Sequence, residues 1–195
     1  MNVPVRMTPA MYRLVARSER AIVLNDPHEL DRAVRKLRGL RFSIFGSADD
    51  PLVASMTAAQ VFLHRRAPGD LDRALNICGV RRQEARDRPA VLAWVEGIRG
   101  DLHLARYHAD GHSADLDWAA EAWQAALDNS DPDDRATRAA GRAWSLITRY
   151  GARHDPADLA EATELCRAHP ALGDSYLERL RATPPGGERP GVPIG

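Results

Sequence analysis

Histidines and carboxylates are concentrated between residues 101 and 115 of the 195-residue chain. Both groups are ordinary zinc ligands, and a helix that binds zinc places two histidines four residues apart on one face. Here His103 and His108 are five residues apart, and His112 lies beyond Gly111, which ends a helix. We therefore interpret the three histidines as surface or groove residues and predict no metal site.

One pair of residues, His64 with Asp101, has the chemistry for acid–base catalysis. An imidazole and a carboxylate can exchange protons with a substrate near neutral pH, but such pairs are more often structural. The sequence contains no G-x-S-x-G, no H-E-x-x-H and no glycine-rich phosphate loop. We therefore predict that the protein is not an enzyme, has no catalytic residue and needs no cofactor.

The elements that carry these residues follow a pattern that occurs four times. Leucine marks the pattern at spacings of 41, 45 and 43 residues: Leu30, Leu71, Leu116 and Leu159. An acidic residue directly precedes each leucine: Glu29, Asp70, Asp115 and Asp158. Alanine stands three residues after each leucine: Ala33, Ala74, Ala119 and Ala162. A period of about 20 to 50 residues is typical of arrays in which each helical hairpin buries its apolar face on the next.

Two further positions of the pattern are mostly bulky. Nine residues before the leucines stand Ala21, Phe62, Tyr107 and Tyr150. Seven residues after them stand Leu37, Cys78, Trp123 and Cys166. A small alanine lets the two helices of a hairpin approach each other, and the bulky positions fill the space to the next hairpin. Because the two cysteines share one position of the pattern, we expect buried, reduced thiols in place of a disulfide or a nucleophile.

These spacings predict an all-α fold, an α-solenoid of about four stacked antiparallel hairpins with about nine helices. Acid–proline pairs and glycines mark most of the helix ends. Thr8 is expected to cap the first helix and Ser113 the sixth, whereas the seventh is expected from Asp131 to Gly151. A ninth helix is expected from Leu172 to Arg181.

The helical domain is predicted to span residues 1–182. Residues 183–195 are rich in proline and glycine and are expected to be disordered. The connection at 39–49 contains Phe42, Ile44 and Phe45, which are too apolar for an idle surface loop. We expect these side chains to plug the end of the first hairpin in preference to docking a partner.

The segments ADLDWAAEAWQAAL and PADLAEATELCRAH, each preceded by a tyrosine-ended helix, resemble tetratricopeptide repeats (TPR). They are most similar to the long-loop type common in actinobacterial proteins, often beside CHAT peptidase or regulatory domains. The resemblance covers residues 8–168, although the family's tryptophan and Leu-Gly positions are not kept and the connecting turn is longer. It implies that the tyrosine-ended helices line a concave groove and that the other helices form an outer layer.

The resemblance also implies which side chains face the groove. Six residues are expected to bind a ligand or partner: Gln60, His64, Asp101, His108, Trp144 and Thr148. Met56, Leu102 and Ser145 are expected to face the groove beside them. Such a mixed surface with one aromatic anchor suits a peptide or a small amphiphilic molecule.

Two functions follow as hypotheses. The first is a non-catalytic scaffold or adaptor that binds a peptide or partner segment in the groove. The alternative is a small helical enzyme or ligand carrier of a biosynthetic pathway, with a pocket lined by His64, Asp101, His108 and Trp144.

Charge and hydropathy indicate which classes of partner to expect and where in the cell the protein is expected. Formal net charge is zero, but residues 1–100 hold 17 basic and 11 acidic side chains, and the remainder is acidic. This asymmetry could support self-association. The basic half is interleaved with acids, so we do not expect nucleic-acid binding. The first residues lack the apolar block of a secretion signal, and no apolar run is long enough for a membrane helix, so we expect a cytoplasmic protein.

Overall fold

The computed structural model describes residues 8–40 and 51–169, and all regular secondary structure within these ranges is helical. The helices are α1 (Pro9–Leu24), α2 (Pro27–Leu40), α3 (Pro51–Arg65), α4 (Asp70–Glu84), α5 (Pro89–Asp110), α6 (Ala114–Asp128), α7 (Arg135–Arg153) and α8 (Pro156–Ala168). The expected ninth helix, the expected apolar plug at residues 42–45 and the expected tail at 183–195 lie outside the described residues. None of the described helices combines the length and the apolar character needed to cross a membrane.

Side-chain caps fix several helix starts as predicted. Thr8 Oγ1 accepts a hydrogen bond from the Met11 backbone N–H at 3.3 Å. Asp155 Oδ1 accepts one from the Ala157 N–H at 2.9 Å, and Pro156 follows at the first helical position, where its missing N–H is harmless. Ser113 also precedes a helix, but its side chain makes no capping bond, so that part of the prediction was wrong.

Helix α7 begins and ends later than predicted. Its start moves to Arg135 because residues 131–134 form a turn, in which the Asp134 N–H donates to the Asp131 carbonyl at 3.1 Å. At the other end the helix continues through Gly151 to Arg153. His154 then adopts a left-handed φ of 57° and donates its N–H to the Tyr150 carbonyl at 2.7 Å, which closes the last turn.

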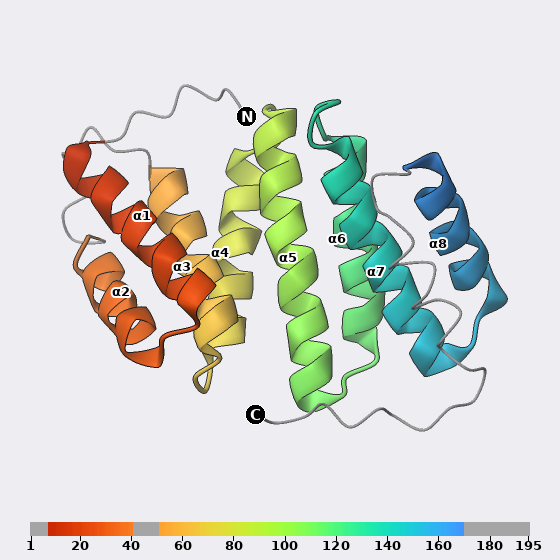
Figure 1. The fold of residues 1–195 in the computed structure, drawn as a ribbon, viewed down its shortest axis with the longest axis horizontal. Helices are drawn as coiled ribbons and strands as arrows, with labels where there is room; N and C mark the ends of the chain where they lie inside the picture. Colours follow the sequence, from red (N-terminus) through yellow and green to blue (C-terminus); the bar gives the residue numbers. More distant parts are fainter. Residues whose placement is uncertain (1–7, 41–50, 170–195) are drawn as a thin grey trace.

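The helices lie side by side in chain order, from α1 and α2 at one side of the molecule to α8 at the other (Figure 1). Each helix packs against the next one along the chain. The odd-numbered helices also contact one another in sequence, α1 with α3, α3 with α5, and α5 with α7. These contacts make the odd-numbered helices one continuous layer, onto which the even-numbered helices pack.

The small positions of the sequence pattern are buried within the first half or at the middle of α2, α4, α6 and α8. All four alanines are at most 2% exposed: Ala33, Ala74, Ala119 and Ala162. Cys78 and Cys166 are buried free thiols, and burial raises the pKa of the Cys78 thiol to about 12. Since a thiol reacts as its thiolate, Cys78 is unsuited to nucleophilic chemistry at neutral pH.

Trp123 occupies a space that three glycines leave open. A Cβ on Gly100 of α5 would lie 2.5 Å from Trp123 Cδ1, and a Cβ on Gly141 of α7 would lie 2.4 Å from Trp123 Cε3. Gly97 faces the same indole, with Trp123 Cζ3 at 3.3 Å from the place of its Cβ. Glycine weakens a helix interior by about 1 kcal/mol relative to alanine. Here it lets α5, α6 and α7 close around the largest side chain.

Candidate functional site

The six residues expected to bind a partner come from α3, α5 and α7, the odd-numbered helices that pack in sequence. Three of them are exposed: His64, Asp101 and His108. The other three are half-buried: Gln60, Trp144 and Thr148. All six therefore retain some accessibility.

Trp144 and Thr148 are held in place by contacts with the interior and within α7. Trp144 packs with Tyr107 against the cluster formed by Leu104, Leu116 and Ala119. Thr148 Oγ1 donates to the Trp144 carbonyl at 2.9 Å, one turn earlier in α7. The indole is thus anchored in the interior while part of it remains accessible, which is the arrangement expected of a rigid aromatic contact.

His64 and Asp101, the candidate acid–base pair, lie beside different arginines. Partial burial together with the nearby charge of Arg66 lowers the pKa of His64. Asp101 is exposed to water, yet the surrounding protein desolvates its carboxylate and raises its pKa to about 6, against the opposing charge of Arg138. Arg138 comes from α7, so the surroundings of Asp101 include groups of both α5 and α7.

Several residues expected to face a groove are instead buried. Met56 and Leu102 are fully buried, and Ser145 is buried with its hydroxyl donating to the Arg142 carbonyl at 2.7 Å. Because each odd-numbered helix contacts its odd-numbered neighbour as well as the even-numbered helices, fewer positions per turn remain accessible than the sequence suggested.

His103 is also buried, contrary to the expectation of a surface or groove histidine. Its Nδ1 lies 2.7 Å from Asp115 Oδ1, and its ring lies 5.4 Å from that of Trp118, measured between centroids. Burial lowers the pKa of His103. Because an ionised carboxylate can only accept, the ring donates to Asp115 through Nδ1–H. Within residues 8–40 and 51–169, no group of three or more histidine, cysteine or acidic side chains is arranged to hold a metal ion.

The acidic residue that precedes each leucine has a structural partner that the sequence pattern did not reveal. Three of these aspartates are buried, and each accepts hydrogen bonds from Nε and Nη2 of one arginine in the preceding helix: Arg65 with Asp70, Arg106 with Asp115, and Arg149 with Asp158. We call each such pair an arginine clasp. In the first hairpin, Arg17 Nε donates to Glu29 at 3.1 Å.

Each clasp arginine also reaches back to the previous hairpin through its remaining nitrogen, Nη1. The acceptors are the aspartates directly after the pattern leucines: Asp31 at 3.0 Å from Arg65, Asp72 at 3.3 Å from Arg106, and Asp117 at 3.2 Å from Arg149. The Asp-Leu-Asp sequence therefore joins two hairpins. Its first carboxylate binds the clasp arginine of the same hairpin, and its second carboxylate binds the clasp arginine of the following hairpin.

A weak sequence signal for the clasps was present. Arg106 and Arg149 directly precede the tyrosines of the pattern, but Arg65 stands three residues after Phe62. The offset of four residues is about one helical turn, so the three guanidinium groups share a helix face although they do not share a column. Residue-by-residue alignment therefore missed them.

A fourth buried acid, Glu96, joins α4 to α5. Glu96 is fully buried and accepts hydrogen bonds from Arg82 of α4 and, at 2.6 Å, from Arg99 Nη1. Like the clasps, this arrangement neutralises a buried carboxylate by charge-assisted hydrogen bonds. These acids and arginines are occupied in holding helices together and are not available for chemistry.

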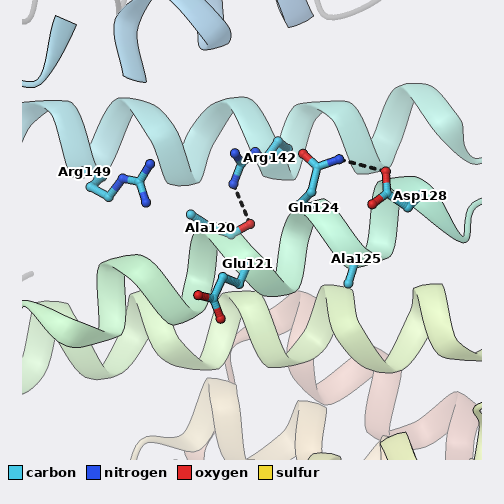
Figure 2. A pocket seen from close by; sticks show the side chains of 7 residues that line it. All are labelled: Ala120, Glu121, Gln124, Ala125, Asp128, Arg142 and Arg149. Carbon is cyan, nitrogen blue, oxygen red and sulfur yellow. Dashed lines mark hydrogen bonds between the residues drawn. The ribbon is translucent and has the colours of Figure 1, made fainter. Parts of the chain in front are cut away.

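A hollow of about 350 Å³ lies along α6 and α7, and none of the six predicted residues lines it (Figure 2). Five of its lining residues come from α6 and two from α7: Ala120, Glu121, Gln124, Ala125, Asp128, Arg142 and Arg149. Arg142 Nη1 donates to the Ala120 carbonyl at 2.6 Å, and Gln124 Nε2 donates to Asp128 at 2.8 Å. Both arginines are committed to carboxylates of α8 as well, so the hollow presents few uncommitted groups to a ligand.

Comparison with known proteins gives no match to a protein-family model, a curated protein or a solved structure.

Proposed function

We propose that the chain is a tetratricopeptide-like α-solenoid that acts as a non-catalytic scaffold or adaptor. It binds a peptide or partner segment along the layer of α3, α5 and α7. The observation that carries the proposal is that the accessible residues of this layer are mixed in character, with an anchored indole at Trp144 and charged groups at Asp101 and His108. Such surfaces suit the recognition of peptide segments.

The disposition of the ionisable groups supports a binding role over a catalytic one. The buried carboxylates are neutralised within the clasps and around Glu96, and His103 is bound to Asp115. Cys78, with its raised pKa, is not a reactive thiol. What remains accessible is suited to hydrogen bonding and charge recognition.

A second candidate, an enzyme or ligand carrier, is favoured by one observation. The pKa of Asp101 is about 6, so this carboxyl group exchanges its proton near neutral pH. In an enzyme or ligand carrier, Asp101 would bind a hydrogen-bond donor of a small molecule and Arg138 would bind an anionic group of the same molecule. Thermal shift measurements with a library of small polar metabolites test this function. A ligand that stabilises the chain but not Asp101→Asn would favour it.

Peptide selection tests the scaffold directly. The purified chain selects from random peptides displayed on phage, and the affinity of the best peptide is measured by fluorescence anisotropy. Asp101→Asn and His108→Gln alter exposed side chains, so the fold should persist. Each is expected to weaken binding by about tenfold, the effect of losing one charged contact.

The matched control is Glu121→Gln, an exposed acid of the hollow in Figure 2. Binding should be unchanged in this variant. Failure to select any peptide would contradict the proposed function. So would a peptide that is sensitive to Glu121→Gln and indifferent to Asp101→Asn and His108→Gln.

A further inference from the structure

Three nitrogen-bearing side chains share the C-terminal ends of α3 and α5. His64 is the second-last residue of α3, Arg66 is the first residue after that helix, and His108 is the third-last residue of α5. The two helices pack against each other and end at the same side of the molecule, where each leads into its connection to the next helix (Figure 1). All three side chains are exposed.

The backbone and the base of the Arg66 side chain are fixed in place. Arg66 has a left-handed φ of 52°, and its N–H donates to the Phe62 carbonyl at 3.1 Å. Its Nε donates to the Leu63 carbonyl at 3.3 Å. The two terminal nitrogens extend beyond these contacts, and no carboxylate of the described residues pairs with them. Arg65 and Arg106, the other arginines at this end of α3 and α5, are held in clasps.

The two imidazoles experience the charge of the same guanidinium group. Partial burial, followed by the charge of Arg66, lowers the pKa of both His64 and His108. Because one guanidinium group acts on both rings, and because α3 and α5 pack against each other, the three side chains form a single cluster. A negatively charged ligand would be attracted to the Arg66 guanidinium group and would favour the protonated form of both rings.

We propose that His64, Arg66 and His108 together bind a carboxylate side chain of an acidic partner segment. This inference rests on the proposed function. It adds that the bound partner segment is acidic where it contacts the C-terminal ends of α3 and α5. The paired terminal nitrogens of Arg66 match the two oxygens of a carboxylate. Each imidazole supplies a further N–H donor beside them.

A labelled hexaglutamate peptide is the probe, and hexaglutamine is its uncharged counterpart. Arg66→Asn removes the guanidinium group, while asparagine tolerates the left-handed backbone of this position. The affinity of the Arg66→Asn variant for hexaglutamate in low salt should fall by about tenfold. The affinity of the double variant His64→Gln/His108→Gln should fall as well. Circular dichroism establishes that the variants remain folded.

Arg86→Gln is the matched control, because it removes one exposed arginine from the connection that precedes α5, at the opposite end of this helix from His108. Its affinity should equal that of the unaltered chain. The inference would be overturned if Arg86→Gln and Arg66→Asn lost affinity for hexaglutamate equally, or if Arg66→Asn lost none. So would tighter binding of a single-stranded oligonucleotide than of hexaglutamate.

The two proposals fail in different ways. If hexaglutamate does not bind but a peptide selected from the phage library still depends on Asp101, the acidic class is wrong and the scaffold stands. If no peptide is selected at all, the scaffold proposal fails and the acidic class fails with it.

Discussion

Trp123 shows how one large side chain depends on its neighbours. The equivalent residues in the other hairpins are Leu37, Cys78 and Cys166, all smaller. The indole is accommodated because Gly100 and Gly141 have no side chain where its ring lies. Its Nε1–H is buried without an acceptor among the described residues, so shape alone holds the ring in place.

Gly100→Ala should therefore destabilise the protein, although alanine is the better helix former. The added Cβ would lie 2.5 Å from Trp123 Cδ1, and overpacking of this kind costs about 1–3 kcal/mol. Urea denaturation measures the change. The matched control is Gly79→Ala in α4, where nothing lies within 4 Å of the added Cβ. There we expect stabilisation by about 1 kcal/mol. Equal effects at the two sites would contradict the packing argument.

The buried His103 gives stability a dependence on pH. Burial holds its pKa below the ordinary value of 6.5, so the unfolded chain binds more protons than the folded one between the two values. Stability should therefore fall as pH decreases through about 6.5. His103→Gln should reduce the fall in melting temperature between about pH 7 and pH 5, whereas exposed His112→Gln should leave that fall unchanged. A curve for His103→Gln that parallels the unaltered chain would contradict this assignment.

The arginine clasps set the register between consecutive helices. In the third hairpin, Asp115 is fully buried and accepts from Arg106 and His103. Burial alone would raise the pKa of Asp115, but these hydrogen bonds and the adjacent positive charges hold it below its ordinary value. The second carboxylate of the same segment, Asp117, has a lowered pKa because Arg153 and Arg149 bind it. Two adjoining helices and the next hairpin are thus joined through one short sequence.

Removing a buried clasp carboxylate should cost far more than removing an exposed one. Asp115→Ala leaves Arg106 without its buried partner, and loss of one member of a buried ion pair costs about 3–5 kcal/mol. Asp72→Ala removes an acid whose side chain is 69% exposed, and we expect at most about 1 kcal/mol. Thermal and urea unfolding of both variants measure the difference. Similar losses in the two variants would show that the clasp is not an organising contact.

The four hairpins are joined to their neighbours in a line, and the described contacts run from each helix to those nearby in the chain. The series of second aspartates stops at the last hairpin, where Ala160 stands in place of Asp31, Asp72 and Asp117. A further hairpin could not dock on α8 through the same clasp.

Local weakening of such an array should remain local. Arg149→Gln breaks the contacts of α7 with α8 and with Asp117. Hydrogen exchange followed by mass spectrometry should show faster exchange in α6, α7 and α8, with α1 to α3 little affected. The control is Arg17→Gln at the other end, which should affect α1 and α2. Uniformly faster exchange along the chain in Arg149→Gln would mean that the helices unfold as one unit.

Periodicity was sufficient to predict the helices, because apolar spacing, proline and capping residues act within a few residues of one another. Thr8 and Asp155 cap their helices through contacts that span two or three residues. The alanine positions are buried in equivalent places because a small residue is needed wherever two helices close. The links from the clasp arginines to the previous hairpin could not be predicted from local sequence, since Arg106 and Asp72 are 34 positions apart and meet only after two hairpins have packed. The sequence also did not predict which side chains of the layer of odd-numbered helices are buried. Leu102 and His103 are buried by contacts between helices, and no local pattern specifies those contacts.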